Sequence, residues 1–533
     1  MTPHSAPMPL SRLLAEAGIP VPPLVEGITV SGISTDSRTL SAGDLFIALT
    51  GFHTDARRYI AEALAKGAAA ILCEAGGDAP STGDVPIITV PSARRAMAYL
   101  YDALYGHPAR SLRLVGVTGT NGKTSVSTML YSILRAAGIP CGLIGTVGCY
   151  APGEDTPIDR AADGLFSGMT TPDPNLLYPL LARMAASAPP SPYPTTVVME
   201  VTSHALLLGK VAPLTFDLSV FTNLTPEHMD LHGTMEDYYA AKRELFAVSR
   251  EAVINADDRY GRRLLSEPLP IHHYHICHAE VTTAALSDRM CPAGEGGCTR
   301  LYAEQVKLLG ESGVSFKLTS PDARIRLRCP TPGQFTVMNA LEAASAALAL
   351  DVSPAVVRDA LATFGGVPGR MEAVSLPPTD IPFSVFIDFA HTPDALETLL
   401  STVHGFRRRG QRIVLVFGCG GDRDPTKRKT MARIASRMTD SLVITSDNSR
   451  SEDPDAIIAD ILGGVDKESE FAVIPDRESA IRYAIQHARG GDIILLAGKG
   501  HENYEIDKEG KHPFCEKDIA VQAAREFHSR HDS

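Results

Sequence analysis

A lysine and a threonine, Lys123 and Thr124, follow a run of small residues in the stretch VGVTGTNGKTSVSTML. Backbone N–H groups of a Gly-rich turn can converge on an anion, and the lysine adds positive charge at the same place. The threonine hydroxyl can bind Mg²⁺ beside a nucleotide phosphate. The strict phosphate-loop pattern has a glycine where Val117 stands, and an ordinary tight turn is the alternative. The stretch predicts a nucleoside triphosphate site.

Two regular elements are expected on either side of this turn. The apolar run at residues 112–117 has strand character. After the turn, apolar residues recur at helical spacing, at Val126, Met129, Leu130, Ile133 and Leu134. Gly138 is the expected C-cap of that helix. A strand, a Gly-rich turn and a helix in this order aim N–H groups and a helix N-terminus at one point, where a phosphate fits.

Three further polar residues are candidates for the same site. Glu200 ends the strand-like run TTVVME, and an acid at the end of a neighbouring strand is where phosphate-loop enzymes hold Mg²⁺. His228, in NLTPEHMDLHG, follows another strand-like run and could complete a second Mg²⁺ shell, although a lone histidine is usually structural. Lys242 lies in the helical stretch EDYYAAKRELF, where the pattern alone predicts a solvated lysine.

The C-terminal part alternates apolar runs with helical stretches, which predicts a mostly parallel sheet covered by helices. Ligands of such sheets bind outside the carboxyl ends of the strands. Polar residues gather after the apolar runs, at residues 388–391, 418–424, 447–450, 476–477 and 498–502. Arg450 could pair with a ligand carboxylate, and Glu502 could accept from an ammonium group. A second binding surface is therefore expected here.

Composition limits the class of protein. The chain has 533 residues and a formal charge of −12, which argues against a nucleic-acid binder. No apolar run approaches a membrane span, so no membrane insertion is expected, and the first residues lack the pattern of a signal peptide. The nine cysteines are scattered, which favours reduced thiols and a cytoplasmic location.

One stretch, IHHYHICHAE at residues 271–280, is rich in His and Cys and precedes Cys291 and Cys298. It contains no C-x-x-C pair, and alternate residues of a strand point to opposite faces. A solvated strand face is therefore predicted rather than a zinc site.

The organisation of the chain predicts an α/β protein of three domains. Residues 1–108 contain short strands and a helix, which predicts a small N-terminal α/β domain. Residues 109–368 carry the phosphate-loop pattern and form the predicted central, P-loop ATPase-like domain. Residues 369–533 form the predicted C-terminal, Rossmann-like domain, and GHPAR at residues 106–110 is the expected first linker.

Taken together, these patterns resemble the Mur ligases, ATP-dependent enzymes that build the peptide of the bacterial cell wall. The matching motifs span nearly the whole chain: STDSR, GDLFIAL, GTNGKTS, LIGTVG, TTPDP, EVTSHAL, NLTPEHMDLHG, YYAAKRELF, VMNALEAA, GRME, DFAHTPDAL, GCGGDRD, SDNSRSEDP and GKGHENYE. The last four resemble the member that adds the third amino acid. The resemblance implies a UDP-substrate-binding N-terminal domain, an ATP-binding central domain and an amino-acid-binding C-terminal domain.

The resemblance also implies roles for residues around ATP. The nucleotide would be bound by Gly119, Thr120, Asn121, Gly122, Lys123, Thr124, Ser125, Asn339, Arg370 and Asp388. Two Mg²⁺ ions would be held by Thr124, Glu200, His228 and Lys242. The last of these matches the family's carbamylated lysine, because an ammonium beside two dications would be repelled. The catalytic residues would be Lys123, Glu200, His228 and Lys242.

The two other substrates would have contacts of their own. The UDP-linked substrate, a UDP-N-acetylmuramoyl dipeptide, would be bound by Ser37, His53, Thr170, Thr171, Thr202 and Lys210. The incoming amino acid would be bound by Arg423, Asp447, Asn448, Arg450, Gly498 and Glu502. The family usually has proline at the position of Ser449.

The implied reaction is ADP-forming amide ligation through an acyl phosphate. We expect meso-diaminopimelate as the amino acid, because the fork of Arg450 suits its extra carboxylate. The alternatives are the same ligase acting on L-lysine, a ligase similar to folylpolyglutamate synthetase, and a non-catalytic nucleotide-binding regulator. We expect a monomer that binds these small molecules and no nucleic acid.

Overall fold

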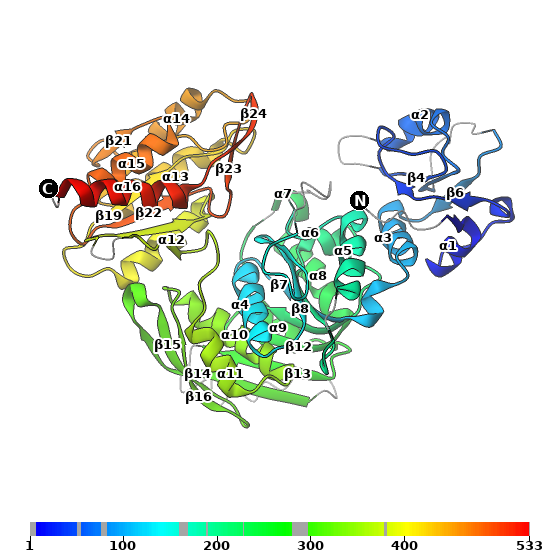
Figure 1. Cartoon of the computed structure of the whole chain (residues 1–533), viewed down its shortest axis with the longest axis horizontal. Helices are drawn as coiled ribbons and strands as arrows, with labels where there is room; N and C mark the ends of the chain where they lie inside the picture. Colours follow the sequence, from blue (N-terminus) through cyan, green and yellow to red (C-terminus); the bar gives the residue numbers. More distant parts are fainter. Residues whose placement is uncertain are drawn as a thin grey trace. The chain divides into compact units, whose positions relative to one another are not determined.

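The computed structural model describes residues 7–50, 55–75, 83–158, 169–187, 190–227, 229–279, 297–377 and 381–531 (Figure 1). The chain forms two compact units. Unit 1 holds residues 1–302 and 341–357, and unit 2 holds residues 303–340 and 358–533. Among the helices in these ranges, none is both long and apolar enough to cross a lipid bilayer.

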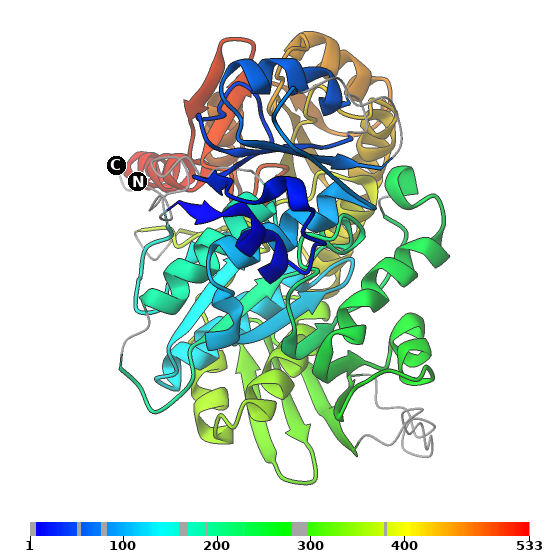
Figure 2. The same ribbon diagram turned by 90° about the vertical axis from the view of Figure 1, so that its right-hand side faces the viewer.

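Unit 1 begins with a small parallel sheet, drawn in blue in Figures 1 and 2. Its strands, in spatial order, are β3 (Ile33–Ser34), β4 (Leu45–Ala48), β5 (Ala70–Glu74) and β6 (Ile87–Val90). The pair β1 (Met8–Pro9) and β2 (Thr29–Val30) precedes it, and the helices are α1 (Leu10–Glu16), α2 (Ile60–Ala65) and α3 (Ala93–Leu104). The short strands predicted for residues 1–108 are found here, with three α-helices in the described residues rather than the single one expected. The expected linker contains a short 3-10 turn at Pro108–Ser111.

The large sheet of unit 1 surrounds the strand that precedes the Gly-rich turn. From β14 onward, the strands of this sheet in spatial order are β14 (Gly297–Leu308), β13 (His273–His278), β12 (Ser249–Asn255), β11 (Phe216–Phe221), β7 (Arg113–Thr118), β10 (Thr196–Glu200), β8 (Cys141–Gly145) and β9 (Gly148–Tyr150). The strand before the turn is β7. All pairs from β14 to β8 are parallel, and β9 is antiparallel to β8. The helices around it are α4 (Lys123–Ala136), α5 (Pro174–Ala186), α6 (Ser203–Leu207), α7 (Met229–His232), α8 (Met235–Ala247) and α9 (Arg259–Leu265).

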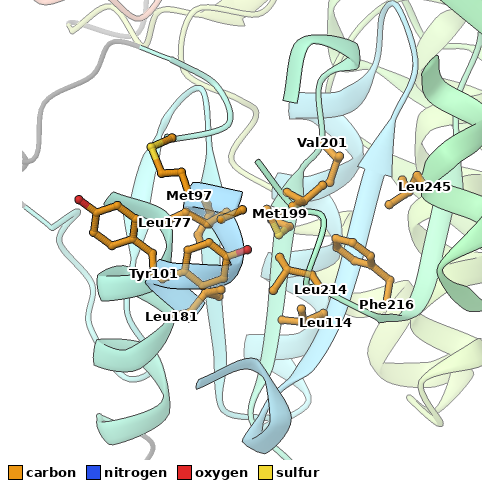
Figure 3. Packing of buried hydrophobic residues seen from close by; sticks show 14 of the residues in the cluster. Met97, Tyr101, Leu114, Leu177, Leu181, Met199, Val201, Leu214, Phe216 and Leu245 are labelled. Atoms are coloured by element: carbon orange, nitrogen blue, oxygen red, sulfur yellow. The ribbon is translucent and has the colours of Figure 1, made fainter. Parts of the chain in front are cut away.

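Periodicity correctly predicted the buried face of α4. All five apolar residues at helical spacing are buried, but the C-cap is Ala137 rather than the predicted Gly138, which comes next with a φ of 71°. Apolar packing also joins α3 to the large sheet. Met97 and Tyr101 of α3 share one core cluster with Leu177 and Leu181 of α5, as Figure 3 shows. The N-terminal sheet and the phosphate-loop sheet are therefore linked by buried apolar contacts.

Unit 2 contains a second, mostly parallel sheet. Its strands in order are β17 (Glu372–Ala373), β18 (Ser384–Asp388), β22 (Ile493–Ala497), β19 (Ile413–Phe417), β20 (Ser441–Ile444) and β21 (Phe471–Val473), and only the β17–β18 pair is antiparallel. The apolar runs predicted as strands form β18 to β22. The antiparallel strands β15 (Val314–Thr319) and β16 (Arg324–Cys329) follow β14 in the order of the ten-stranded sheet, and β23 (Tyr504–Asp507) forms a separate antiparallel pair with β24 (Gly510–Pro513).

Helices cover both faces of this second sheet. One apolar cluster joins it to α12 (Pro393–Phe406), α13 (Thr426–Met438) and α14 (Pro454–Leu462). Another joins the opposite face to α15 (Arg477–Gln486) and α16 (Glu516–His531). Successive residues of β19 alternate between the two clusters, as the pleat of a strand requires. The remaining helices are α10 (Phe335–Ala349) and α11 (Pro354–Ala362).

Candidate functional site

The Gly-rich turn lies at the carboxyl end of β7, between β11 and β10. Helix α4 begins at Lys123, directly after the turn. Gly122 is its N-cap with a φ of 86°, in the left-handed region that favours glycine. At Gly119, a Cβ atom would overlap the hydroxyl of Thr222. The glycines therefore permit a tight loop whose N–H groups and helix N-terminus can face a phosphate.

The segment after β11 holds the loop in place. Asn223 accepts the N–H of Thr120 on its carbonyl oxygen at 2.8 Å and the N–H of Asn121 on its side chain at 2.9 Å. The hydroxyl of Thr120 accepts the N–H of Thr225 at 3.0 Å. The loop is thus held in place by hydrogen bonds to the backbone and the side-chain amide of the segment after β11.

Two lysines converge on the same loop carbonyl. The Nζ of Lys123 donates to the carbonyl oxygens of Gly119 and Thr120 at 2.9 and 2.7 Å. The Nζ of Lys242, from α8, donates to the Gly119 oxygen at 2.7 Å. It also lies 4.8 Å from the ring centroid of Tyr238. Two lysine side chains therefore lie at the loop where the phosphates of a nucleotide would bind.

Lys242 is buried, with 1% of its surface exposed, so the solvated lysine predicted from the helical pattern alone is wrong. The reason is that α8 turns this side chain against the phosphate loop. Burial, with the charge of Lys123 acting in the same direction, holds the pKa of Lys242 well below its ordinary value, although Glu227 opposes the shift. At any given pH, a larger fraction of this side chain is therefore the neutral amine, which is the nucleophilic form, than for a lysine in water.

Glu200 is also buried and faces α4. Its carboxylate accepts the hydroxyl of Thr124 at 2.9 Å and the N–H of Thr146 at 2.8 Å. The Thr146 hydroxyl donates to the same carboxylate at 3.2 Å. A carboxylate and two hydroxyls at hydrogen-bond distance are hard oxygen donors that suit Mg²⁺, so the residues present fit this ion. His228, the other candidate ligand, lies outside the described residues. In the described part of the chain, no group of three His, Cys, Asp or Glu side chains forms a metal site.

The predicted contacts of the UDP-linked substrate continue from Glu200. Thr170 shares a hydrogen bond of 3.1 Å with Thr146, and Thr171 donates to the backbone oxygen of Glu200 at 2.9 Å. The hydroxyls of Thr171 and Thr202 are 3.2 Å apart. These hydroxyls form a polar strip beside the phosphate loop. Sequence reasoning did not select Thr146, although it lies in the matching motif LIGTVG.

Of the other predicted contacts of that substrate, Lys210 reaches this strip, because its Nζ donates to the backbone oxygen of Thr171 at 3.5 Å. Lys210 is buried, pairs with Asp173 at 2.8 Å and contacts the sulfur of Met169 at 3.3 Å. In the turn after β3, the hydroxyl of Ser37 donates to Glu62 at 2.9 Å. His53 lies outside the described residues.

The second candidate site is at the carboxyl ends of β20 and β22 in unit 2. Asn448 donates to the carboxylate of Glu502 at 2.7 Å and accepts from Lys499 at 2.9 Å. Lys499 also lies 3.8 Å from the carboxylate of Asp447. A Cβ atom on Gly498 would lie 2.6 Å from that carboxylate. The Nη1 of Arg450 donates to the carbonyl oxygen of Asn448 at 3.3 Å, so the structure brings together five of the six residues predicted to hold the amino acid, and adds Lys499 from the motif GKGHENYE.

Arg450 stands in the same loop with a φ of 53°, an unusual conformation for a residue with a side chain. Its Nη1 donates to the carbonyl oxygen of Gly421 at 2.8 Å. No hydrogen bond from its Nη2 or Nε is found in the described ranges, so that edge can receive a ligand. Arg423 is exposed and donates to the carbonyl oxygen of Asp422 at 3.1 Å.

Three predicted nucleotide contacts lie in or beside unit 2. Asp388, at the end of β18, accepts the N–H groups of Met371 and Ala390 at 2.8 and 2.9 Å. Burial raises its pKa, while the charge of Arg370 acts in the opposite direction. The guanidinium of Arg370 lies 5.1 Å from the ring centroid of Phe389. Asn339 is a buried residue of α10.

The histidine-rich stretch forms β13, in the interior of its sheet. His275 pairs with Glu251 at 3.1 Å, and His278 pairs with Asp257 at 3.2 Å. His273 shares a hydrogen bond of 2.9 Å with Thr299. The predicted solvated face is therefore wrong, because parallel neighbours on both sides half-bury the imidazoles and supply partners. Cys291 lies outside the described residues.

Three family models match consecutive parts of the chain. The model of the Mur ligase family catalytic domain matches residues 29–105, that of the Mur ligase middle domain matches residues 117–347, and that of the Mur ligase glutamate ligase domain matches residues 369–500. The α/β, three-domain fold class expected from the sequence is confirmed by these matches.

Named relatives cover almost the whole chain. The UDP-N-acetylmuramoyl-L-alanyl-D-glutamate--2,6-diaminopimelate ligase of Geobacillus kaustophilus is 39% identical over 507 residues, which are 93% of this chain and 95% of the relative. The ligase of the same name from Gloeobacter violaceus is 39% identical over 526 residues, 98% of this chain and 99% of the relative. A solved structure with this name has a TM-score of 0.62 at 28% identity, and covers 95% of this chain and 96% of that one.

Proposed function

The chain belongs to the Mur ligase family, and we propose that it joins meso-diaminopimelate to UDP-N-acetylmuramoyl-L-alanyl-D-glutamate in an ATP-dependent, ADP-forming reaction. The observation that carries this proposal is the 39% identity, over 93% of the chain, to a ligase named for these substrates. The phosphate loop, with Thr124 bonded to the buried acid Glu200, supports the ATP-dependent step. The product is a precursor of peptidoglycan.

The chemistry requires an activated carboxyl group, because a carboxylate is a poor acylating agent. Transfer of the γ-phosphoryl group of ATP to the substrate carboxylate gives an acyl phosphate and ADP. The amine of the amino acid then attacks the carbonyl carbon, the new amide forms, and phosphate leaves. Lys123 and the N–H groups of the loop would stabilise the charge on the transferring phosphoryl group. Mg²⁺, held by Thr124 and Glu200, would neutralise further negative charge when bound.

Lys242 is proposed to be carbamylated in the active enzyme. The lowered pKa of its amine supports this, since only a neutral amine reacts with CO₂. The carbamate nitrogen retains one N–H, so the bond to the Gly119 oxygen can persist. The anionic carbamate would face the positive charge of Lys123 and, together with His228, could help to bind a second Mg²⁺.

We propose that Arg450 selects the amino acid. Its Nη1 is fixed by the Gly421 oxygen, so the guanidinium plane is held in one orientation. The remaining N–H groups suit a carboxylate that meso-diaminopimelate carries and L-lysine lacks. Glu502, whose pKa is raised chiefly by burial, would accept from an ammonium group of the ligand. With L-lysine bound, the arginine would have no carboxylate partner, which disfavours that substrate.

The test is phosphate release from ATP and the UDP-linked dipeptide, measured with a panel of amino acids. The wild type should prefer meso-diaminopimelate over L-lysine, and Arg450→Ala should lose most of that preference. A charge-assisted hydrogen bond contributes about 1.5–3 kcal/mol, so a loss of roughly 10- to 150-fold is expected. Arg433→Ala, at an exposed position of α13, is the matched control and should leave the preference unchanged. Efficient use of L-lysine by the wild type would overturn the assignment of the amino acid.

The remaining organisation is proposed from the same family membership. We place the UDP-substrate domain at residues 1–108, the ATP domain at residues 109–368 and the amino-acid domain at residues 369–533. Ser37 and His53 would contact the uridine diphosphate end of the substrate. Thr170, Thr171, Thr202 and Lys210 would bind its phosphates, sugar and peptide. We also propose a monomeric enzyme that acts in the cytoplasm.

A further inference from the structure

Arg477 is a buried arginine beside the amino-acid site that the proposed function does not use. It follows β21 and opens helix α15, whose N-cap Asp476 accepts the N–H of Ser479 at 2.8 Å. Most charged residues at such a position extend into solvent, but the side chain of Arg477 has 0% of its surface exposed. The guanidinium therefore points into unit 2 rather than away from it.

The guanidinium bridges three separate segments. Its Nη1 donates to the carbonyl oxygen of Ser446 at 3.0 Å, and its Nη2 donates to the carbonyl oxygen of Ala497 at 2.9 Å. Its Nε donates to the carboxylate of Glu516, at the start of α16, at 2.8 Å. Ser446 directly precedes Asp447. Ala497 is the last residue of β22 and directly precedes Gly498.

Ala497 ends β22, and Ser446 lies two residues after the end of β20, so both carbonyl groups directly precede the amino-acid loops. One loop runs through residues 447–450 and the other through residues 498–502. A Cβ atom on Gly498 would lie 2.6 Å from the carboxylate of Asp447 and 3.9 Å from the Nη2 of Arg477. The two loops therefore pass each other close to this guanidinium, which bonds to the residue before each of them.

Stability alone does not explain a charge in this position. Burying an arginine and a glutamate costs desolvation free energy, and such a pair often contributes little to stability. In addition, one oxygen of Glu516 has no hydrogen-bond partner among the described residues. The planar fork of arginine, however, holds up to five N–H donors in fixed directions on three nitrogens, whereas the ammonium of lysine presents three from one rotatable nitrogen.

We propose that Arg477 is a positioning residue that fixes the distance between the two loops and thereby sets affinity and selectivity for the incoming amino acid. This inference rests on the proposed function, because the loops matter only if they bind that substrate. Arg477 itself does not contact the amino acid. Its effect is transmitted through Asp447 and Gly498.

The same sheet offers a matched control at the opposite ends of its strands. Arg412 directly precedes β19, and Asp492 directly precedes β22. The Nε and Nη2 of Arg412 donate to the carboxylate of Asp492 at 3.1 and 2.8 Å. This pair also ties two strands together through a buried carboxylate, but at their amino ends. Replacing Arg412, which has only a structural role, can therefore be compared with replacing Arg477, which joins the two amino-acid loops.

The experiment compares wild type, Arg477→Lys, Glu516→Gln and Arg412→Lys in the full chain. For each, KM for meso-diaminopimelate, KM for ATP, kcat, the preference over L-lysine and the thermal midpoint are measured. Arg477→Lys should raise KM for the amino acid at least about tenfold and lower the preference, with KM for ATP within about twofold of wild type. Glu516→Gln, which leaves the arginine in place but removes its charged partner, should raise the amino-acid KM by about threefold.

Arg412→Lys should lower the thermal midpoint while leaving both KM values within about twofold of wild type. An unchanged amino-acid KM and preference in Arg477→Lys would overturn the inference. If that variant does not fold, an unchanged KM in Glu516→Gln overturns it instead. A wild type that releases no phosphate in response to meso-diaminopimelate would refute the proposed function itself, which is a different result.

Discussion

Replacing Glu342 should stabilise the protein by an amount that depends on pH. Glu342 lies in α10 and is fully buried, and neither carboxylate oxygen has a hydrogen-bond partner in the described part of the chain. Burial raises the pKa of Glu342 well above its ordinary value of 4.5, and the negative charges of Asp257 and Asp258 add to the shift. In the described part of the chain, the native state therefore supplies no hydrogen bond to offset the cost of burying this carboxyl group.

The size of the effect follows from these facts. A buried polar group without hydrogen bonds costs roughly 1–3 kcal/mol, and Glu342→Met, which keeps the side-chain length, should remove that cost. A second contribution appears above pH 4.5, the ordinary value, because the unfolded chain then releases the proton while the folded chain keeps it. Stability of the wild type should fall by up to about 1.4 kcal/mol for each pH unit from there to the folded-state pKa. Below pH 4.5 this second contribution is absent.

Urea unfolding followed by circular dichroism, between about pH 5 and pH 8, measures both contributions. The advantage of Glu342→Met over wild type should widen as the pH rises. Glu342→Gln should also remove the pH dependence but should keep the cost of an unpaired polar group. Glu244→Gln, at an exposed position of α8, controls for the change in net charge. A difference between Glu342→Met and wild type that stays constant with pH would show that Glu342 does not bind its proton more tightly when folded, and would refute the reasoning.

Two further predictions concern the phosphate loop. Lys123→Ala should abolish amino-acid-dependent phosphate release, because the residue supplies charge at the loop, and turnover near that of wild type would contradict the assignment of the ATP site. Lys242→Ala should be almost inactive and should regain part of its activity with a small carboxylate such as acetate, whereas Lys242→Arg should not be rescued. Mass spectrometry of the wild type after trapping of the carbamate by methylation gives an independent reading, and an unmodified Lys242 in active enzyme would refute the carbamate.

Local sequence patterns predicted the elements of the candidate site well. The strand before Lys123, the turn and the helix after it depend on glycine conformation and on helical periodicity, which are properties of neighbouring residues. The buried strands of unit 2 were readable for the same reason, as short apolar runs between polar turns. Periodicity also placed Glu200 at the end of a strand, but its bond to the Thr124 hydroxyl joins residues 76 positions apart.

Burial of individual polar residues was not predictable in this way. Lys242 has the sequence context of a surface lysine, and its burial results from packing of α8 against a loop 123 residues earlier in the chain. The histidines of β13 were assigned to solvent because the neighbours of a strand in a sheet cannot be read from its own sequence. Local patterns therefore identify elements and their polar ends, while the contacts that change a pKa come from long-range packing.

Asn448 shows how this distinction bears on the amino-acid site. The motif assigns it to the ligand, but its side chain already bonds to three parts of the protein: Nδ2 donates to Glu502, and Oδ1 accepts from Lys499 and from the N–H of Ile506 at 2.9 Å. An amide has two donor hydrogens and one oxygen, so one hydrogen remains for the substrate. Asn448 is thus suited to orient Glu502 while making at most a single bond to the amino acid. On the proposed function, we therefore expect discrimination to depend on Arg450 and Glu502, two charged groups whose remaining hydrogen-bonding capacity would match the charges of the proposed ligand.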